Sequence, residues 1–110
     1  MSFETHLVTF ADSKYKPSLE RIKNQAHDLN TFNYIHLCNE TTIVELSNKY
    51  SLDFFKNNPG YGFWIWKPYI IKKIFDNLNE GDVLIYMDAG CEINYRAKRK
   101  FKYLINKLKR

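Results

Sequence analysis

The sequence contains little of what would place it in several common classes of protein. Of its 110 residues only two are cysteines, Cys38 and Cys91, which are too few and too isolated for a disulfide framework or a zinc site. Glycine and proline together number seven, which gives no indication of disorder or of a fibrous repeat. No apolar run approaches the roughly 20 residues of a membrane helix, and residues 1–5 lack the features of a secretion signal. We therefore expect a cytoplasmic protein whose two cysteines are free, buried thiols.

The composition that remains is typical of a folded domain. Hydrophobic residues make up 45% of the chain and aromatic residues 16%. A chain of 110 residues can bury one modest core but cannot form two complete domains. We interpret residues 1–110 as a single domain.

Charge is distributed unevenly along the chain. Residues 95–110 contain eight lysines or arginines and no acidic residue, whereas in the first 94 residues nine basic residues face 12 acidic ones. The net charge of +5 therefore belongs to the C-terminal segment. This pattern predicts a basic amphipathic helix whose charges are either simply solvated or attracted to an anionic membrane surface through residues 96–110, on the cytoplasmic face. A basic nucleic-acid-binding domain is a weaker alternative.

Local patterns predict alternating strands and helices. Strand-like runs occupy residues 5–10, 32–38 and 83–87. Helical patterns occupy residues 19–29 with Ser18 as the N-cap, 41–50, 52–57, 68–78 with Pro68 at the start, and 95–110. The three longest have apolar stripes at helical spacing: Leu19, Ile22, Ala26 and Leu29; Ile70, Ile71, Ile74, Phe75 and Leu78; and Ala97, Phe101, Leu104, Ile105 and Leu108.

The order of these elements predicts an α/β fold. Alternation of strands and helices favours a Rossmann-like, open, mostly parallel sheet flanked by helices. The run 83–87 is apolar without interruption, which predicts a central strand covered on both faces. Ligands of such sheets bind at the carboxyl ends of the strands, where Asp12 and Asp88 are expected.

Asp88 is the strongest candidate for a residue with a chemical role. A carboxylate at the end of a buried strand can bind a hard divalent cation, and the small residues Ala89 and Gly90 allow a ligand to approach the backbone. Glu92 is a candidate for a second metal-binding oxygen. The alternative is that Asp88 is only a turn residue.

Two segments resemble a known family. The sequence WIWKPY at residues 64–69, followed by YMDAGCEIN at residues 86–94, resembles glycosyltransferases of the GT-A type found in surface-polysaccharide loci and in some large viruses. Residues 7–12, and Gln25 with Ala26, are similar to the start of that family. The resemblance covers about residues 5–94 and is weak between residues 38 and 57. It implies that the chain corresponds to the N-terminal, donor-binding half of a truncated GT-A fold.

The resemblance also implies a reaction and its binding residues. The expected activity is transfer of a hexose from a nucleotide-diphosphate sugar to a glycan or lipid-linked acceptor, with Mn²⁺ or Mg²⁺ as cofactor. The implied donor-binding residues are Phe10, Ala11, Asp12, Lys67, Asp88, Ala89 and Gly90. Asp88 would bind the metal, and Lys67 would contact phosphate or the donor sugar, so that both would stabilise the departing nucleoside diphosphate.

Other interpretations remain open. The family's Asp-x-Asp motif has Gly90 at its third position here, and the acceptor half is not expected within 110 residues, so a non-catalytic GT-A-like module is the alternative function. Trp64 and Trp66 are candidates for stacking on a sugar or base, or else form a packed corner. Lys67 is otherwise a solvated helix residue and Asp12 a loop cap. The histidines, His6, His27 and His36, are interpreted as structural or surface residues.

Overall fold

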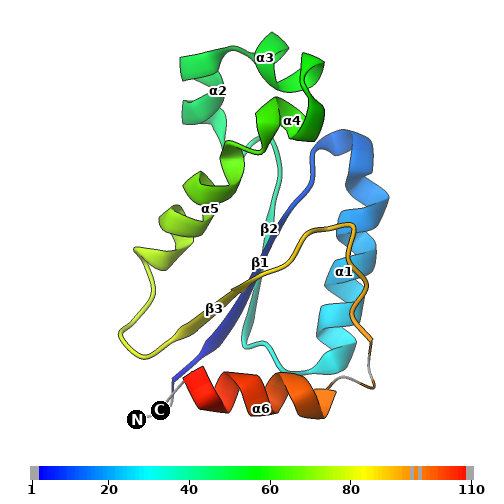
Figure 1. Cartoon of the computed structure of the whole chain (residues 1–110), viewed down its shortest axis with the longest axis vertical. Helices are drawn as coiled ribbons and strands as arrows, with labels where there is room; N and C mark the ends of the chain where they lie inside the picture. The colour runs from blue at the N-terminus through cyan, green and yellow to red at the C-terminus, as the bar shows by residue number, and fades with distance from the viewer. Residues whose placement is uncertain (1–2, 95, 97, 109–110) are drawn as a thin grey trace.

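The protein is a three-stranded parallel sheet with helices on both faces (Figure 1). A computed structural model of the chain describes residues 3–94, 96 and 98–108. The strands are β1 (Thr5–Phe10), β2 (Tyr34–Cys38) and β3 (Val83–Tyr86), in the order β2-β1-β3. Both pairings of β1 are parallel, with His6 opposite Tyr34 in one and Thr5 opposite Val83 in the other. This confirms the predicted α/β class and open parallel sheet.

The helices connect the strands and close the two faces. They are η1 (Ser13–Tyr15), α1 (Lys16–Leu29), α2 (Val44–Tyr50), α3 (Leu52–Asn57), α4 (Pro59–Phe63), α5 (Trp66–Phe75) and α6 (Lys98–Leu108). In Figure 1, α2 to α4 lie beyond the carboxyl ends of the strands, and α6 crosses the opposite end of the molecule.

Two hydrophobic clusters lie on opposite faces of the sheet, because successive strand residues point to opposite sides. On one face, Val8 and Phe10 pack with residues of α3 and α5, including Phe55 and Ile70. The second cluster is formed by α1, the other sheet face and the segments after β3: Leu7, Ile22, Ala26, Leu29 and Ile93, with Phe101 of α6 against them. The sheet is therefore covered on both sides.

The central strand is β1 rather than β3. All six residues of β1 are buried, whereas β3, which was predicted to be central, is one of the two edge strands of the described sheet and is half-buried after Val83. The apolar run of β3 is explained by the two clusters: Leu84 and Tyr86 pack on one face, and Ile85 and Met87 on the other. An unbroken apolar run in a strand thus indicates that both faces of the strand are covered. It does not show whether neighbouring strands pair with it on one edge or on both.

Helix α1 follows the predicted stripe. Its buried residues are the four predicted ones, Leu19, Ile22, Ala26 and Leu29. The predicted N-cap was wrong, since the helix begins at Lys16 and includes Ser18; the preceding turn η1 leads directly into it. At the other end, Asn30 takes a left-handed conformation with φ of 53°, a common helix termination.

Several other predictions were wrong in detail. Helix α5 begins at Trp66, not Pro68, because Ile65 before it already has right-handed helical angles, with φ of −64° and ψ of −20°. Phe75, the last residue of α5, is 62% exposed although it belongs to the predicted apolar stripe. Cys38 is buried but Cys91 is exposed, because it follows the turn after β3, outside the sheet. Both cysteines are free, as predicted. In the C-terminal stripe, Ile105 is buried but Leu104 and Leu108 are exposed, and Ala97 lies outside the described residues.

The segment around α4 forms an unusual left-handed turn. Residues 60–64 all have positive φ, including the non-glycine residues Tyr61, Phe63 and Trp64. A Cβ atom on Gly62 would lie 2.6 Å from the ring of Phe55, and one on Gly60 would lie 2.1 Å from the indole of Trp64. Both glycines are therefore required by backbone conformation and by close packing of an aromatic ring.

We predict that Gly62→Ala lowers the free energy of unfolding by about 2 kcal/mol or more, because it combines a left-handed backbone with steric overlap. Gly90→Ala is the matched control, since a Cβ there has nothing within 4 Å and Gly90 has no positive φ. Urea denaturation followed by circular dichroism measures both. Equal stability of the two variants would contradict the described turn.

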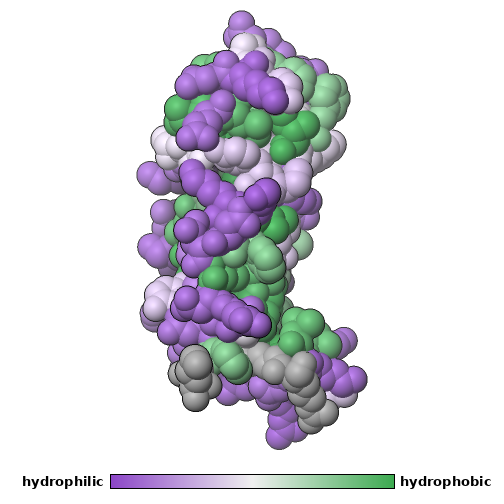
Figure 2. Space-filling view, turned by 90° about the vertical axis from the view of Figure 1, so that its left-hand side faces the viewer, coloured by the Kyte–Doolittle hydropathy of each residue, from purple (hydrophilic) through white to green (hydrophobic). Residues whose placement is uncertain are grey.

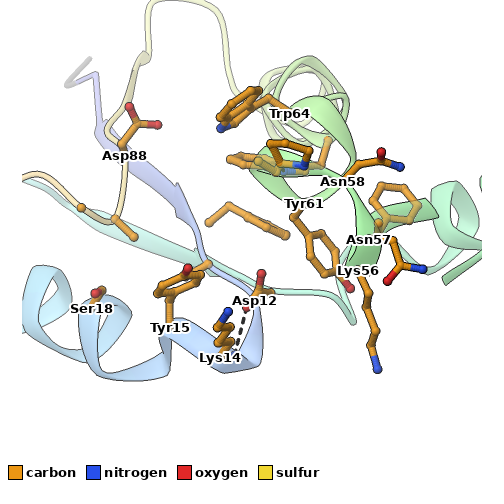
Figure 3. Close-up of a pocket in the computed structure, with 18 residues that line it drawn as sticks. Asp12, Lys14, Tyr15, Ser18, Lys56, Asn57, Asn58, Tyr61, Trp64 and Asp88 are labelled. Atoms are coloured by element: carbon orange, nitrogen blue, oxygen red, sulfur yellow. Dashed lines mark hydrogen bonds between the residues drawn. The ribbon is translucent and has the colours of Figure 1, made fainter. Parts of the chain in front are cut away.

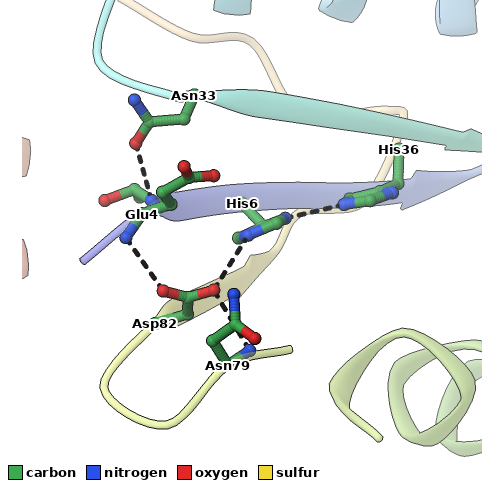
Figure 4. Close-up of polar contacts among 7 residues, drawn as sticks. Glu4, His6, Asn33, His36, Asn79 and Asp82 are labelled. Atoms are coloured by element: carbon green, nitrogen blue, oxygen red, sulfur yellow. Dashed lines mark hydrogen bonds and ion pairs between the residues drawn. The ribbon is translucent and has the colours of Figure 1, made fainter. Parts of the chain in front are cut away.

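A polar chain joins the three strands at their amino-terminal half (Figure 4). His6 Nδ1 and His36 Nε2 are 2.9 Å apart, and His6 Nε2 lies 3.5 Å from Asp82 Oδ2, which is long for a hydrogen bond. The Asp82 carboxylate accepts hydrogen bonds from the backbone N–H groups of Glu4 and Asn79, chiefly the former, and these contacts lower its pKa. His6 and His36 thus contact each other across β1 and β2.

We predict that stability falls as the pH drops below about 6.5, the ordinary pKa of histidine. Burial, and next the neighbouring His6, lower the pKa of His36. Since the folded state then binds the proton less readily than the unfolded state, the contribution is present above pH 6.5 and is lost on acidification. Unfolding midpoints between pH 8 and 5 should show a shallower decline in His36→Gln. The exposed His27→Gln is the control, and an unchanged slope in His36→Gln would contradict the assignment.

Candidate functional site

A pocket of about 640 Å³ opens at the carboxyl ends of the strands (Figure 3). It lies between the ends of β1 and β3, where the chain order of the sheet reverses: β2 lies on one side of β1 and β3 on the other. This switch point is the usual ligand site of open parallel sheets. Six of the predicted donor residues line the pocket, with both predicted stacking residues: Phe10, Ala11, Asp12, Asp88, Ala89 and Gly90, together with Trp64 and Trp66.

The loop after β1 forms one wall of the pocket. Asp12 Oδ1 accepts a hydrogen bond from Lys14 N at 3.0 Å, so Asp12 caps the turn η1 and lines the pocket at the same time. Glu40, which follows β2, accepts hydrogen bonds from the backbone N–H and hydroxyl of Ser13 at 2.8 and 2.6 Å. The loop is therefore fixed to the ends of two strands.

Asp88 lies opposite, held by two residues. Its Oδ1 accepts a hydrogen bond from the hydroxyl of Tyr86 at 2.8 Å and lies 3.3 Å from Lys67 Nζ. The Lys67 ammonium is also 4.9 Å from the centre of the Tyr86 ring. Burial, followed by the hydrogen bond to Asp88, strongly raises the pKa of Tyr86, which therefore stays a protonated donor. The Asp88 side chain remains 59% exposed, so Asp88 is oriented but accessible to a ligand.

The left-handed turn supplies an aromatic wall. The indole of Trp66 is 5% exposed, stacks on Phe10 with ring centroids 4.0 Å apart, and donates a hydrogen bond to the Gly60 carbonyl at 2.9 Å. Trp66 therefore joins the turn to the end of β1. Trp64, in contrast, is 52% exposed and borders the pocket, as does Tyr15, which is 54% exposed. Trp66 is thus packed against the end of β1, whereas Trp64 is open to solvent at the border of the pocket.

Sequence reasoning missed the residue that holds the loop after Asp88. Arg21, on α1, donates hydrogen bonds to the carbonyls of Ala89 at 2.7 Å and Cys91 at 2.9 Å. Arg21 also donates to Gln25 Oε1, which accepts from Ile93 N at 2.9 Å. An arginine next to the stripe residue Ile22 carries no signal in a single sequence, although Gln25 was part of the family resemblance.

The pocket also contains basic residues that were not predicted. Lys14 and Lys56 line it, on η1 and α3 respectively. Lys67, which was predicted to bind the donor, does not line the cavity. It is paired with Asp88, which does line it. Glu92 is exposed and does not line the cavity. The local charge around the pocket therefore combines two carboxylates with three ammonium groups.

The donor set for a divalent cation is small. Among the described residues, no group of three or more histidine, cysteine, aspartate or glutamate side chains is placed to hold a metal ion. Asp88 alone presents an accessible carboxylate at the end of β3. One carboxylate fits Mg²⁺ or Mn²⁺ only where a substrate's phosphates and water supply the other oxygens. Asp88 therefore suits a metal ion that enters the pocket already bound to the phosphates of a substrate. It does not suit a metal ion held by protein ligands alone.

Comparison with known proteins gives no match: no protein-family model, no curated protein and no solved structure matches this chain. No helix within the described residues is both long enough and apolar enough to span a membrane. Any assignment of function therefore starts from the geometry of the pocket.

We predict that Arg21→Ala loosens the loop after Asp88, because it removes two hydrogen bonds from a charged donor, each contributing about 1.5–3 kcal/mol. Hydrogen exchange at the Ile93 amide, which donates to Gln25, should accelerate at least about tenfold. Lys23→Ala, on the exposed side of the same helix, is the control. Equal exchange in the two variants would show that Arg21 does not position the loop.

Proposed function

We propose that the pocket binds a nucleotide-diphosphate sugar and that the chain is the donor-binding half of a GT-A-type glycosyltransferase. The observation that carries the proposal is the meeting of the Phe10–Asp12 and Asp88–Gly90 segments in one cavity at the β1/β3 switch point. These segments are far apart in the sequence, and both were expected to contact a nucleotide sugar. A reaction that transfers hexose to a glycan or lipid-linked acceptor would use this pocket for its donor.

The aromatic wall suits a nucleoside. Trp64 and Tyr15 each present an exposed ring at the cavity, and flat aromatic surfaces stack favourably on bases. The indole of Trp64 lies directly over Gly60, where a Cβ atom would overlap the ring. A stacking surface fixed in advance reduces the entropy lost on binding.

The charged residues suit a diphosphate. Lys67, paired with Asp88 at 3.3 Å, provides an ammonium group beside the cavity, and Lys14 and Lys56 line it. Cations aimed at a leaving diphosphate stabilise the negative charge that develops as the glycosidic bond breaks. A bound Mg²⁺ or Mn²⁺ ion would add Lewis-acid neutralisation of the diphosphate, with Asp88 as its protein ligand.

A non-catalytic binding module is the second candidate. Among the described residues, two carboxylates line the pocket, those of Asp12 and Asp88. Each has one oxygen already engaged, by Lys14 N and by Tyr86 with Lys67 respectively. Donor hydrolysis or sugar transfer by this chain would exclude the binding-only function, whereas donor binding without turnover would support it.

We predict that a uridine or guanosine diphosphate sugar binds in the presence of Mn²⁺ or Mg²⁺ and that Asp88→Asn weakens binding at least about tenfold, since it removes a charged ligand of the metal. Isothermal titration calorimetry with a panel of donors, repeated with a chelator, measures the effect.

Two controls sharpen this experiment. Asp53→Asn removes an exposed carboxylate from α3, outside the pocket, and should bind like the parent chain. Lys67→Met should weaken binding with or without metal, because it removes a charge near the diphosphate. The absence of binding to every donor with metal present would overturn the proposal. Binding unaffected by chelator and by Asp88→Asn would overturn its metal-dependent part.

A further inference from the structure

Helix α6 exposes a stripe of mixed chemistry. Among its exposed side chains, five follow the spacing i, i+3, i+4, i+7 and i+8, which places them along one side of the helix. They are Lys100, Tyr103, Leu104, Lys107 and Leu108. Tyr103 is 59% exposed, Leu104 48% and Leu108 67%. We refer to these five residues as the α6 stripe.

The helix is anchored to the body through a different side. Ile105 is 5% exposed, and Phe101 packs edge-on against Phe32 with ring centroids 6.1 Å apart. These contacts hold α6 across the amino-terminal end of the sheet (Figure 1), so the exposed α6 stripe lies on a helix that is fixed to the body. Leu104 and Leu108 are therefore exposed on a helix that is packed against the body, and their exposure does not come from a detached helix.

The basic residues of α6 have no acidic neighbours within the helix. Within the part of the chain that the structure describes, Arg99, Lys100, Lys102 and Lys107 form no salt bridge. The ammonium of Lys107 instead lies 5.2 Å from the centre of the Tyr103 ring. Of these four cations, Lys100 and Lys107 lie on the same side of the helix as the two exposed leucines, so that side combines positive charge with exposed apolar area.

We propose that the α6 stripe binds the surface of an anionic lipid bilayer. Its leucines would enter the boundary between headgroups and acyl chains, Tyr103 would lie at the headgroup level, and the lysines would extend to the phosphates. Basic residues near such a surface contribute about 1 kcal/mol each. The exposed leucines favour this partner over nucleic acid, whose phosphate backbone rewards the lysines but not apolar side chains.

Within the residues that the structure describes, the face of the molecule that carries α5 has no stripe comparable to the α6 stripe. Figure 2 shows hydrophobic residues on that face in separate patches between hydrophilic ones. The pocket is lined mainly by residues of α3, α4 and the segments at the carboxyl ends of β1 and β3. These elements lie toward the opposite end of the long axis from α6 (Figure 1), so a bilayer bound to α6 would leave the pocket accessible. Membrane binding and donor binding are therefore independent properties that can fail separately.

The test is co-sedimentation of the protein with vesicles of phosphatidylcholine alone or with one quarter phosphatidylglycerol. We expect binding to the anionic vesicles that weakens as salt is raised. Combined Lys100→Gln and Lys107→Gln should weaken partitioning about 30-fold, which is the loss of two such lysines. Combined Leu104→Ser and Leu108→Ser should weaken it at least about tenfold, because less apolar area is buried.

Matched controls separate this from general charge and from folding. Combined Lys16→Gln and Lys23→Gln removes two exposed lysines of α1 and should change partitioning by less than about threefold, since screening limits distant charges. Asp88→Asn should bind vesicles like the parent chain, whatever its effect on donors. Circular dichroism of each variant checks that α6 still forms. All four substituted side chains of α6 are exposed, so the substitutions are expected to leave the fold intact. If the leucine variant is unstable, the vesicle binding of the lysine variant alone decides whether the proposal holds.

Three outcomes would overturn the proposal. The first is no sedimentation with anionic vesicles at low salt. The second is partitioning unchanged in both α6 variants. The third is binding to short DNA or RNA duplexes that equals or exceeds vesicle binding and is insensitive to the leucine changes, which would assign the helix to nucleic acid.

Discussion

The parallel pairing of β1 with both of its neighbours is the constraint on which the rest of the molecule depends. Every residue of β1 is buried, and its registers fix His6 against Tyr34 on one side and against Leu84 on the other. Because all three strands run in the same direction, all three carboxyl ends meet at one edge. The pocket exists because β1 and β3 end there together and the connecting helices leave on opposite faces.

The two faces of the sheet each fix one side of the pocket. From the α1 face, Arg21 holds the carbonyls of Ala89 and Cys91, and so determines where the loop after Asp88 runs. From the α5 face, Trp66 stacks on Phe10 and binds the Gly60 carbonyl, which positions the left-handed turn. The strain of three non-glycine residues in that turn is thus balanced by contacts with the end of β1.

The sequence was sufficient for features that arise from local periodicity and insufficient for those that arise from assembly. The stripe of α1 from Leu19 to Leu29 could be read directly, because helical spacing decides which side is buried. The position of β3 at the edge could not, because an apolar run does not show which strands pair with it. Asp12 and Asp88 could be predicted to meet from the strand ends alone, but the role of Arg21 depends on a contact spanning 68 residues that no local pattern encodes.

Net charge is a poor guide to the pocket, since the positive charge of the chain lies elsewhere. The eight basic residues of the segment 95–110 account for the net +5, and the first 94 residues carry more acidic than basic side chains. An anionic ligand of the pocket is therefore not attracted by the field of the whole domain. It would be recognised by a few ammonium groups at fixed positions, as the 3.3 Å pairing of Lys67 with Asp88 illustrates. Short-range contacts of this kind are screened less by salt than the charges of α6, so the two surfaces differ in physical character as well as in location.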